Sequence, residues 1–476
     1  MIASSRLPSP PDAICRMSVR ELAAQYATGA LSPVQALEAV LARADEVNPQ
    51  LSALYWRMDE TAMAAAVASQ ERWARGEPLS RLDGIPITAK DILDVAGAPT
   101  YLGSATNGGV AASTASDPFV AAFVDRGAVL FAKSTMVETG LYSASFSALY
   151  GPARNPWNLG KSTNGSSSGG AAATAAYLGP LHLGTDGGGS LRSPAAACGC
   201  VALKATANVA PFGAPAGDLP GSAAVKGFLT RDIDDQLFVH AELTGAAPPA
   251  VSPTLGDLRI GYLSRPASDP GIGEVQPVIR AAIEDALDLL AVTGPGPVVE
   301  ELPDPVFAGP MWQAAVESAL RAVGQSRQGL PAELRDRAHP VVHENVARAM
   351  TCTEPDETTL GRLRALLDAG GRRLRSHFER YDVLVLACTY YPSFDAELPW
   401  HPDCAMIESA GYGWTAGACP HLGWAGGGPP SISIPCGLDT DGVPIGMLLV
   451  GRPGHDVPLL HTARQIAQRL RFAPLF

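Results

Sequence analysis

The sequence predicts an α/β fold: a mixed, mostly parallel, twisted central sheet covered by helices on both faces. Apolar runs of strand length, bounded by glycine or proline, recur along the chain, and stretches with helical periodicity lie between several of them. Strands that alternate with helices in this way are typical of α/β proteins. The chain has 476 residues, of which 46% are hydrophobic, so it contains enough apolar material for a large core.

The chain is expected to begin with two helices. Residues Ser18 to Thr28 and Pro33 to Val47 carry apolar side chains at helical spacing. The second helix is preceded by Ser32, a residue type favoured at the N-cap, and proline is favoured at the first helical position. These signals predict a helical pair within the first 70 residues.

Strands and further helices are expected after this pair. The apolar runs that predict strands are 85–89, 128–132, 181–184, 258–263, 383–388, 431–435 and 445–450. Helical patterns cover Pro277 to Val292 and Thr359 to Tyr381. Segments rich in glycine and proline predict loops at Asn208 to Gly221 and Gly294 to Pro310.

Charge and targeting signals exclude several classes of partner. The 47 acidic and 35 basic side chains give a formal net charge of −12 without long like-charge blocks, which argues against nucleic acid as a partner. The N-terminus lacks an apolar core of signal-peptide length, and no run of 18 or more apolar residues follows. We therefore expect a cytoplasmic protein without a membrane partner, present as a monomer or a homodimer.

The strongest chemical signal is a serine that follows three glycines. Residues Gly187 to Gly189 precede Ser190, and a second serine-rich loop, Gly165 to Gly170, lies upstream. Glycine lacks Cβ, so successive N–H groups can converge on one point and a substrate carbonyl can approach closely. An oxyanion hole beside a nucleophile is built in this way.

This segment resembles the signature of the amidase signature family, serine hydrolases that cleave C–N bonds with a Ser-Ser-Lys triad and no metal. The family's lysine motif is matched by Gly84 to Gly97, and the motif before the serine loop is matched by Gly151 to Asn158. The likeness covers roughly three quarters of the chain and is weak from about residue 303 to 428. Because the matched motifs run from residue 84 to 450, we expect one domain over residues 1–476. Its expected parts are N-terminal helices (1–70), a signature core (71–245), a variable substrate-mouth insert (300–428) and a C-terminal core (429–476).

The resemblance implies a catalytic triad of Lys90, Ser166 and Ser190. A serine hydroxyl needs a base, the motifs contain no histidine, and Lys90 acts as a base only when uncharged. Lowering a lysine pKa from ~10.4 to neutrality requires ~4 kcal/mol from desolvation and like charge. In the family, a serine after a cis peptide bond relays the proton. Ungapped spacing from both flanking motifs favours Ser166 as this relay, while the other register would select Ser167.

Supporting roles follow from the same resemblance. Asp186 and Arg192 flank the nucleophile and are expected to pair and hold the loop. No cofactor and no metal are expected. The oxyanion hole is assigned to the backbone N–H groups of Ser190 and of the glycines Gly187, Gly188 and Gly189.

The expected substrates are small uncharged amides with hydrophobic or aryl groups, and possible further substrates are carbamates and esters. Some family members carry an arginine three residues after the nucleophile, where this chain has Ser193, so a carboxylate anchor is missing there. Aromatic side chains offer apolar surface instead. The residues assigned to the substrate pocket are Tyr142, Phe146, Trp414 and Trp424.

Other interpretations of the sequence remain open. The main alternative is the glutamine-amidase subunit of a tRNA-dependent amidotransferase, since that subunit has the same fold. Gly165 to Gly169 also fits the nucleophile elbow of a Ser-His-Asp α/β-hydrolase, with Ser167 as nucleophile, but no apolar strand precedes it. His339 and His343 have helical spacing, but without an accompanying carboxylate motif they are expected to be a surface pair.

Overall fold

The computed structural model describes residues 7–10, 12–207, 209–213, 224–247, 253–265, 274–292, 296–302, 320–351, 356–399, 401–402, 406–407, 412–415 and 428–475. An 11-stranded sheet forms its centre, in the order β1-β3-β2-β6-β8-β7-β14-β15-β11-β9-β10. Its strands are β1 (Leu54–Arg57), β2 (Pro86–Lys90), β3 (Val129–Ser134), β6 (Leu181–Asp186), β7 (Val201–Lys204), β8 (Val225–Thr230), β9 (Arg259–Tyr262), β10 (Val298–Glu301), β11 (Val383–Ala387), β14 (Ser431–Leu438) and β15 (Pro444–Val450). Two short pairs, β4 (Arg154–Asn155) with β5 (Asn158–Ser162) and β12 (Met406–Ile407) with β13 (Tyr412–Thr415), stand apart.

The sheet is mixed, which confirms the predicted fold class. Parallel pairing joins β3, β2 and β6 in one block and β11, β9 and β10 in another. Elsewhere among the described strands the pairs are antiparallel, so the expected predominance of parallel strands holds only within these two blocks. The reason is the chain's connectivity: β14 and β15 are joined by a turn, which permits only antiparallel pairing.

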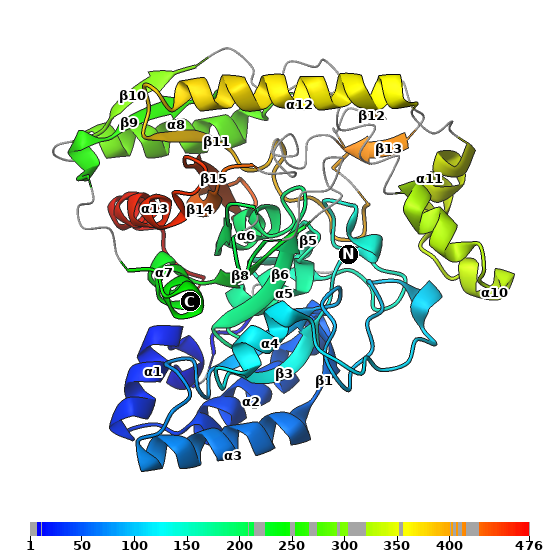
Figure 1. Cartoon of the computed structure of the whole chain (residues 1–476), viewed down its shortest axis with the longest axis vertical. Helices are drawn as coiled ribbons and strands as arrows, with labels where there is room; N and C mark the ends of the chain where they lie inside the picture. The colour runs from blue at the N-terminus through cyan, green and yellow to red at the C-terminus, as the bar shows by residue number, and fades with distance from the viewer. Residues whose placement is uncertain are drawn as a thin grey trace.

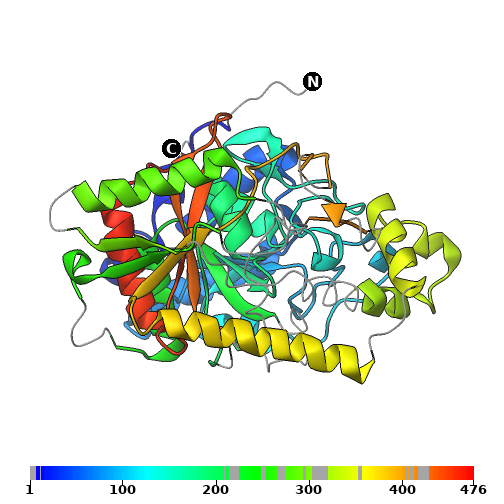
Figure 2. The same ribbon diagram turned by 90° about the horizontal axis from the view of Figure 1, so that it is seen from above.

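Helices cover both faces of the sheet (Figures 1 and 2). On one face pack α2 (Pro33–Leu51), α3 (Asp59–Arg75), α5 (Ser168–Ala175), α6 (Arg192–Cys198) and α12 (Glu357–His377). On the other pack α1 (Val19–Thr28), α4 (Pro118–Val124), α7 (Ile233–Thr244), α8 (Pro277–Val292) and α13 (Asp456–Leu470). Strand β11 shows the consequence: Val383 and Val385 join the core under α8, whereas Leu384 and Leu386 join the core under α12. A strand buried on both faces is continuously apolar.

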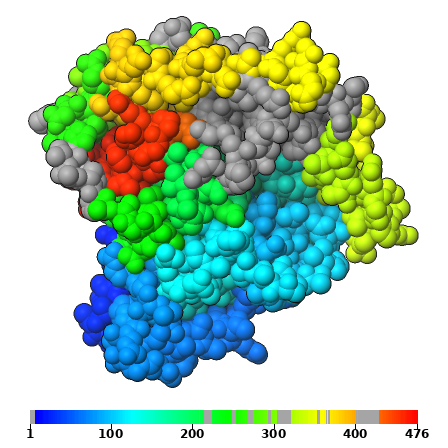
Figure 3. Space-filling model, in the orientation of Figure 1, coloured from blue at the N-terminus to red at the C-terminus, as the bar shows by residue number. Residues whose placement is uncertain are grey.

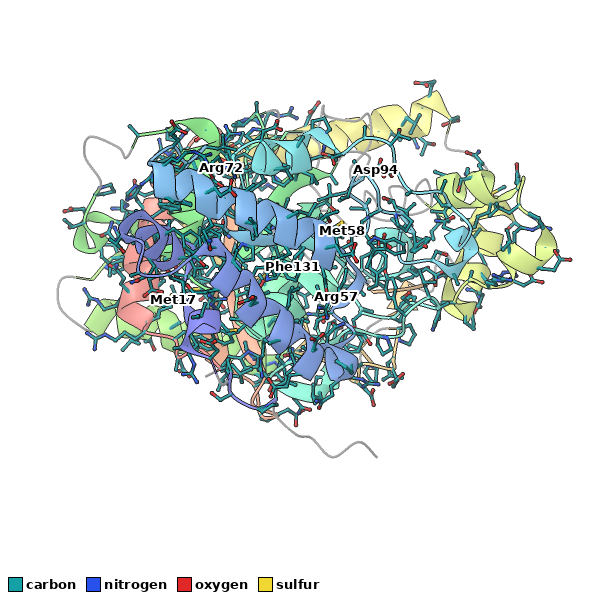
Figure 4. All side chains as sticks on the ribbon, turned by 90° about the horizontal axis from the view of Figure 1, so that it is seen from below. Met17, Arg57, Met58, Arg72, Asp94 and Phe131 are labelled. Atoms are coloured by element: carbon teal, nitrogen blue, oxygen red, sulfur yellow. The ribbon has the colours of Figure 1, made fainter. Side chains whose placement is uncertain are left out.

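The predicted N-terminal helices are confirmed as α1 and α2. Each begins with a capping box, at Ser18 and at Ser32, in which the serine side chain accepts from a backbone N–H and the third helical residue caps in return. Helix α2 runs four residues beyond the predicted end at Val47, because Pro49 lies inside it without ending it. The ring of Phe131 from β3 fills the core beneath α2 and α3 (Figure 4).

Several elements escaped the sequence prediction. Strands β7 and β8 are short or carry Lys226 and Gly227, so neither is recognisable as an apolar run. Strand β10 lies inside the expected loop at 294–310, because pairing with β9 stabilises its four residues. The expected loop at 208–221 falls largely outside the described residues. Within the described part, every helix is too short or too polar to cross a membrane.

The helices α10 (Ala332–Arg335) and α11 (Pro340–Thr351) form a separate group at one margin of the molecule (Figures 1 and 3). Helix α12 lies along one side of the molecule, and α1, α2 and α3 lie along the opposite side (Figure 1). Helices α10 and α11 lie within the segment 303–428, where the resemblance to the family is weak. Helix α10 contacts the short turn η2 (Ala105–Asn107), and α11 contacts β13. Helix α11 also shares an apolar cluster with Tyr142 and Phe146, so this group meets the rest of the molecule beside the segments that follow β2 and β3.

Candidate active site

The candidate site lies where parallel strands β2 and β6 end. Their register pairs Ala89 with Leu183, so the next residues of both strands emerge at the same edge of the sheet. Lys90 is the last residue of β2, and its Nζ lies 2.8 Å from Oγ of Ser166 and 3.1 Å from Oγ1 of Thr185. Strand pairing thus brings the predicted lysine to the predicted serine loop, 76 residues further along the chain.

The environment of Lys90 favours an uncharged amine. Its side chain is only 1% exposed, and burial lowers the pKa of Lys90 to about 7, against the opposing attraction of Asp186. Desolvation disfavours the charged form of an amine because the interior solvates charge poorly. Near neutral pH a substantial fraction of Lys90 therefore carries a lone pair able to accept a proton.

The peptide bond between Gly165 and Ser166 is cis, and the chain enters α5 two residues later. Only glycine fits at position 165, since an added Cβ would lie 2.3 Å from the carbonyl oxygen of Ala144 and 2.6 Å from that of Tyr142. The backbone N–H of Ser167 donates to the carbonyl of Ser190 over 3.0 Å. This bond holds the two serine loops together, so Ser167 contacts the loop of Ser190 through its backbone, while the side chain of Ser166 contacts Lys90.

A buried ion pair braces the loop of Ser190. Arg192 donates to Asp186 through Nε over 2.7 Å and through Nη2 over 2.8 Å, and both side chains are buried. Burial alone would raise the pKa of Asp186, but the Arg192 guanidinium holds the pKa of this carboxyl well below its usual range. The pairing expected from the sequence is therefore present, and its bidentate geometry fixes both ends of the turn.

The three glycines before Ser190 do not share one role. Gly189 has a φ of +111° and its N–H donates to Oδ1 of Asp186 over 2.6 Å, so this N–H group is turned into the loop. The expectation that Gly189 lends its N–H to an oxyanion hole is therefore wrong, because the carboxylate already occupies that donor. Among the described residues, the N–H groups of Gly187, Gly188 and Ser190 have no hydrogen-bond partner. All three residues are half-buried.

The predicted pocket residues fall into two groups. Tyr142 and Phe146 are 6% and 3% exposed and lie in one apolar cluster, with ring centroids 5.0 Å apart. The side chain of Trp414, in β13, and the whole of Trp424 lie outside the described residues. The expected surface pair of histidines is wrong for His339, because its ring packs 4.3 Å from that of Phe146, whereas His343 is exposed.

Three polar residues near the site were missed. Thr185 contacts Lys90, and the parallel register of β2 and β6 was the signal that would have found it. Ser143 Oγ lies 3.3 Å from Oγ of Ser193, which is three residues beyond Ser190. Lys204 is buried beside the ion pair, where desolvation and then the Arg192 charge lower the pKa of its amine to about 8. Thr185 lies in the glycine-rich segment before Ser190 but was given no role there, and neither Ser143 nor Lys204 lies in a motif that stands out by spacing.

The described residues contain no group of three or more His, Cys, Asp or Glu side chains placed to hold a metal ion. The polar groups at the site include the amine of Lys90, the hydroxyls of Ser166 and Thr185, the Asp186–Arg192 ion pair and backbone N–H groups. Such a set suits acyl transfer to a serine, which needs a nucleophile, a proton acceptor and donors for an oxyanion.

Comparison with known proteins shows that the chain is similar to amidases. A family model described as Amidase matches residues 35–460. An acylamidase from Rhodococcus erythropolis is 30% identical over 479 residues, covering 94% of each chain. A glutamyl-tRNA(Gln) amidotransferase subunit from Anaeromyxobacter dehalogenans is 30% identical over 509 residues, covering 97% of this chain and 98% of the other. The crystal structure of a bacterial aryl acylamidase of the amidase signature family superposes with a TM-score of 0.82 at 22% identity, covering 96% of both chains.

Proposed function

Because the chain belongs to the amidase signature family and is an enzyme that hydrolyses amide C–N bonds, we propose that Ser190, Ser166 and Lys90 are its catalytic triad. The observation that carries the proposal is the 2.8 Å contact between Nζ of Lys90 and Oγ of Ser166, in which a buried amine meets the residue of the cis peptide bond. We also propose that the chain is a single domain. One continuous sheet that contains strands from β1 through β15 supports this organisation.

The reaction proceeds through an acyl-enzyme. Oγ of Ser190 attacks the substrate carbonyl carbon while its proton passes to Oγ of Ser166, whose own proton passes to the neutral amine of Lys90. The oxyanion of the tetrahedral intermediate accepts hydrogen bonds from the N–H groups of Gly187, Gly188 and Ser190. As the C–N bond breaks, Lys90 returns its proton through Ser166 to the leaving amine. Water then attacks the ester by the same route and releases the acid and free Ser190.

The proposed substrates are uncharged amides with hydrophobic or aryl groups. Carbamates and esters are included because attack on their carbonyl carbon forms the same kind of tetrahedral intermediate. The acyl group is placed against Tyr142 and Phe146, whose buried rings offer apolar surface. Ser193, beyond the nucleophile, presents a hydroxyl where a carboxylate substrate would need a cation. The relative named acylamidase is 30% identical to this chain, and its name describes hydrolysis of acyl amides, which supports the choice of amides.

The amidase subunit of a tRNA-dependent amidotransferase is the second candidate, because relatives of that name match nearly the whole chain at 30% identity. The two functions differ in the substrate, since glutamine carries charge at its α-carbon and the proposed substrates carry none. The test is kcat/KM of the purified chain for a matched aryl amide, aryl carbamate, glutamine and malonamate. We expect the aryl pair to be preferred; preference for glutamine, or turnover that requires partner proteins, would select the amidotransferase function.

A further inference from the structure

The segment 138–146 forms one wall of the candidate site. A Cβ on Gly140 would lie 3.7 Å from Oγ of Ser166, and the carbonyls of Tyr142 and Ala144 press against Gly165. Interiors packed this closely transmit small displacements to their neighbours. A shift of this segment therefore moves directly against the loop that carries Ser166.

Helix α11 packs on the other side of this segment. Nδ2 of Asn345 donates to the hydroxyl of Tyr142 over 3.2 Å, and Asn345 is 3% exposed. Val342 belongs to the same apolar cluster as Tyr142 and Phe146, and the ring of His339, just before the helix, covers Phe146. The two aromatic rings are thus held between the serine loop and α11.

A buried carboxylate ties the start of α11 to the same segment. Glu138, which has no exposed surface, accepts hydrogen bonds from the N–H of His339 over 3.1 Å and from Oγ of Ser104 over 2.8 Å. The guanidinium of Arg327 lies 3.5 Å from the same carboxylate. Because the carboxylate that accepts these bonds is fully buried and His339 is half-buried, α11 has a defined position relative to Ser166 rather than a loose surface attachment.

We propose that Asn345 is a specificity-determining positioning residue: by holding the Tyr142 ring it closes the acyl side of the site and restricts the enzyme to short acyl groups. The inference rests on the proposed function, which places the acyl group against Tyr142 and Phe146. It goes further by assigning the limit on acyl length to α11, which lies in the part of the chain where the resemblance to the family is weak. The helix group sits at the margin of the molecule, beside surface from the first third of the chain (Figure 3).

The test compares p-nitroanilides of acetic, butyric and hexanoic acid, which share a leaving group and differ only in acyl length. In Asn345→Ala the ratio of kcat/KM for hexanoyl over acetyl should rise about five- to tenfold, mainly through KM, since a few methylenes in an apolar site discriminate on this scale. Tyr142→Phe removes the same hydrogen bond and keeps the ring, so its ratio should move in the same direction. Tyr142→Phe decides the question if Asn345→Ala does not fold.

Arg348→Ala is the matched control, because it removes an exposed pair with Glu344 on the same helix and touches neither ring. Its ratio should equal that of the wild type. If the wild type hydrolyses the anilides but Asn345→Ala and Tyr142→Phe keep the wild-type ratio, or change selectivity only in a series that varies the amine, the inference is overturned. If the wild type hydrolyses none of the anilides, the proposed function itself fails.

Discussion

The amine of Lys90 and the hydroxyl of Ser166 lie 2.8 Å apart in a buried space at the end of two parallel strands. A lysine buried to 1% exposure has few ways to be stabilised as a cation, and here its contacts are two hydroxyls, those of Ser166 and Thr185. This relationship links packing to chemistry: the strand register places the amine, burial lowers its pKa, and the hydroxyl of Ser166 accepts a hydrogen bond from it.

The first prediction concerns the pH dependence of the rate. Since the base must be neutral and burial lowers the pKa of Lys90 to about 7, kcat/KM should rise with pH and level off above about pH 8. Lys90→Arg, which keeps a cation that does not deprotonate, should be inactive at every pH. A profile that falls as pH rises from 6 to 8 would contradict the role of Lys90 as base.

The second prediction concerns stability. The unfolded chain binds more protons at Lys90 than the folded chain between pH 7 and the ordinary lysine pKa, so the Lys90 contribution to the free energy of unfolding rises with pH in that window. Lys90→Met removes the buried amine. The difference between the free energy of unfolding of Lys90→Met and that of the wild type should therefore be more favourable to the variant at pH 6 than at pH 10, by up to ~4 kcal/mol. Denaturant unfolding of both proteins at pH 6 and pH 10 measures these free energies. If the variant and the wild type differ by the same amount at both pH values, the pKa of Lys90 is not lowered.

The third prediction distinguishes the role of Ser166 from that of Ser167 in the upstream loop. Ser190→Ala and Ser166→Ala should each reduce kcat by ~10³-fold or more, because triad members act as a unit. Ser167→Ala should be milder, since the contact of Ser167 with the nucleophile loop is through its backbone N–H, which alanine keeps. Single-turnover rates on an aryl amide provide the measurement. An inactive Ser167→Ala beside an active Ser166→Ala would reverse the assignment.

The fourth prediction concerns the Asp186–Arg192 pair. Asp186→Asn leaves the buried guanidinium without its counter-charge and weakens the bond to the N–H of Gly189, so it should lower the free energy of unfolding by ~3–5 kcal/mol. Glu344→Gln, which weakens an exposed ion pair on α11, should cost less than ~0.5 kcal/mol. Equal losses in the two variants, measured by denaturant unfolding, would show that the buried pair contributes no more than a surface one.

The fifth prediction uses reagents. A fluorophosphonate should label Ser190, since phosphorus accepts the same nucleophile as a carbonyl, and peptide mass mapping locates the adduct. Labelling should be lost in Ser190→Ala and strongly slowed in Lys90→Ala. A metal chelator should leave turnover unchanged, because every step of the proposed reaction is assigned to serine, lysine and backbone N–H groups. Loss of activity on chelation, restored by added metal, would contradict the proposed mechanism.

Local sequence was enough to predict the α/β class, the capped helices α1 and α2 and the strands β2, β3, β6, β11, β14 and β15. Resemblance to the family's motifs selected Lys90, Ser166 and Ser190 as candidates, because those motifs are short stretches of neighbouring residues that can be matched in the sequence. Strands β7, β8 and β10 were missed, since their stability comes from pairing with partner strands rather than from their own apolar pattern.

Tertiary structure alone decided how these residues meet. Thr185 reaches Lys90 through the register of two strands, and Gly189 loses its N–H to Asp186 because the loop folds back on its own carboxylate. Asn345 meets Tyr142 across 203 residues of chain. Local sequence determines which chemical groups are present and which strongly patterned segments form helices or strands, because these depend on the spacing of neighbouring residues. Which donor faces which acceptor depends on packing between distant segments, and only the folded chain defines it.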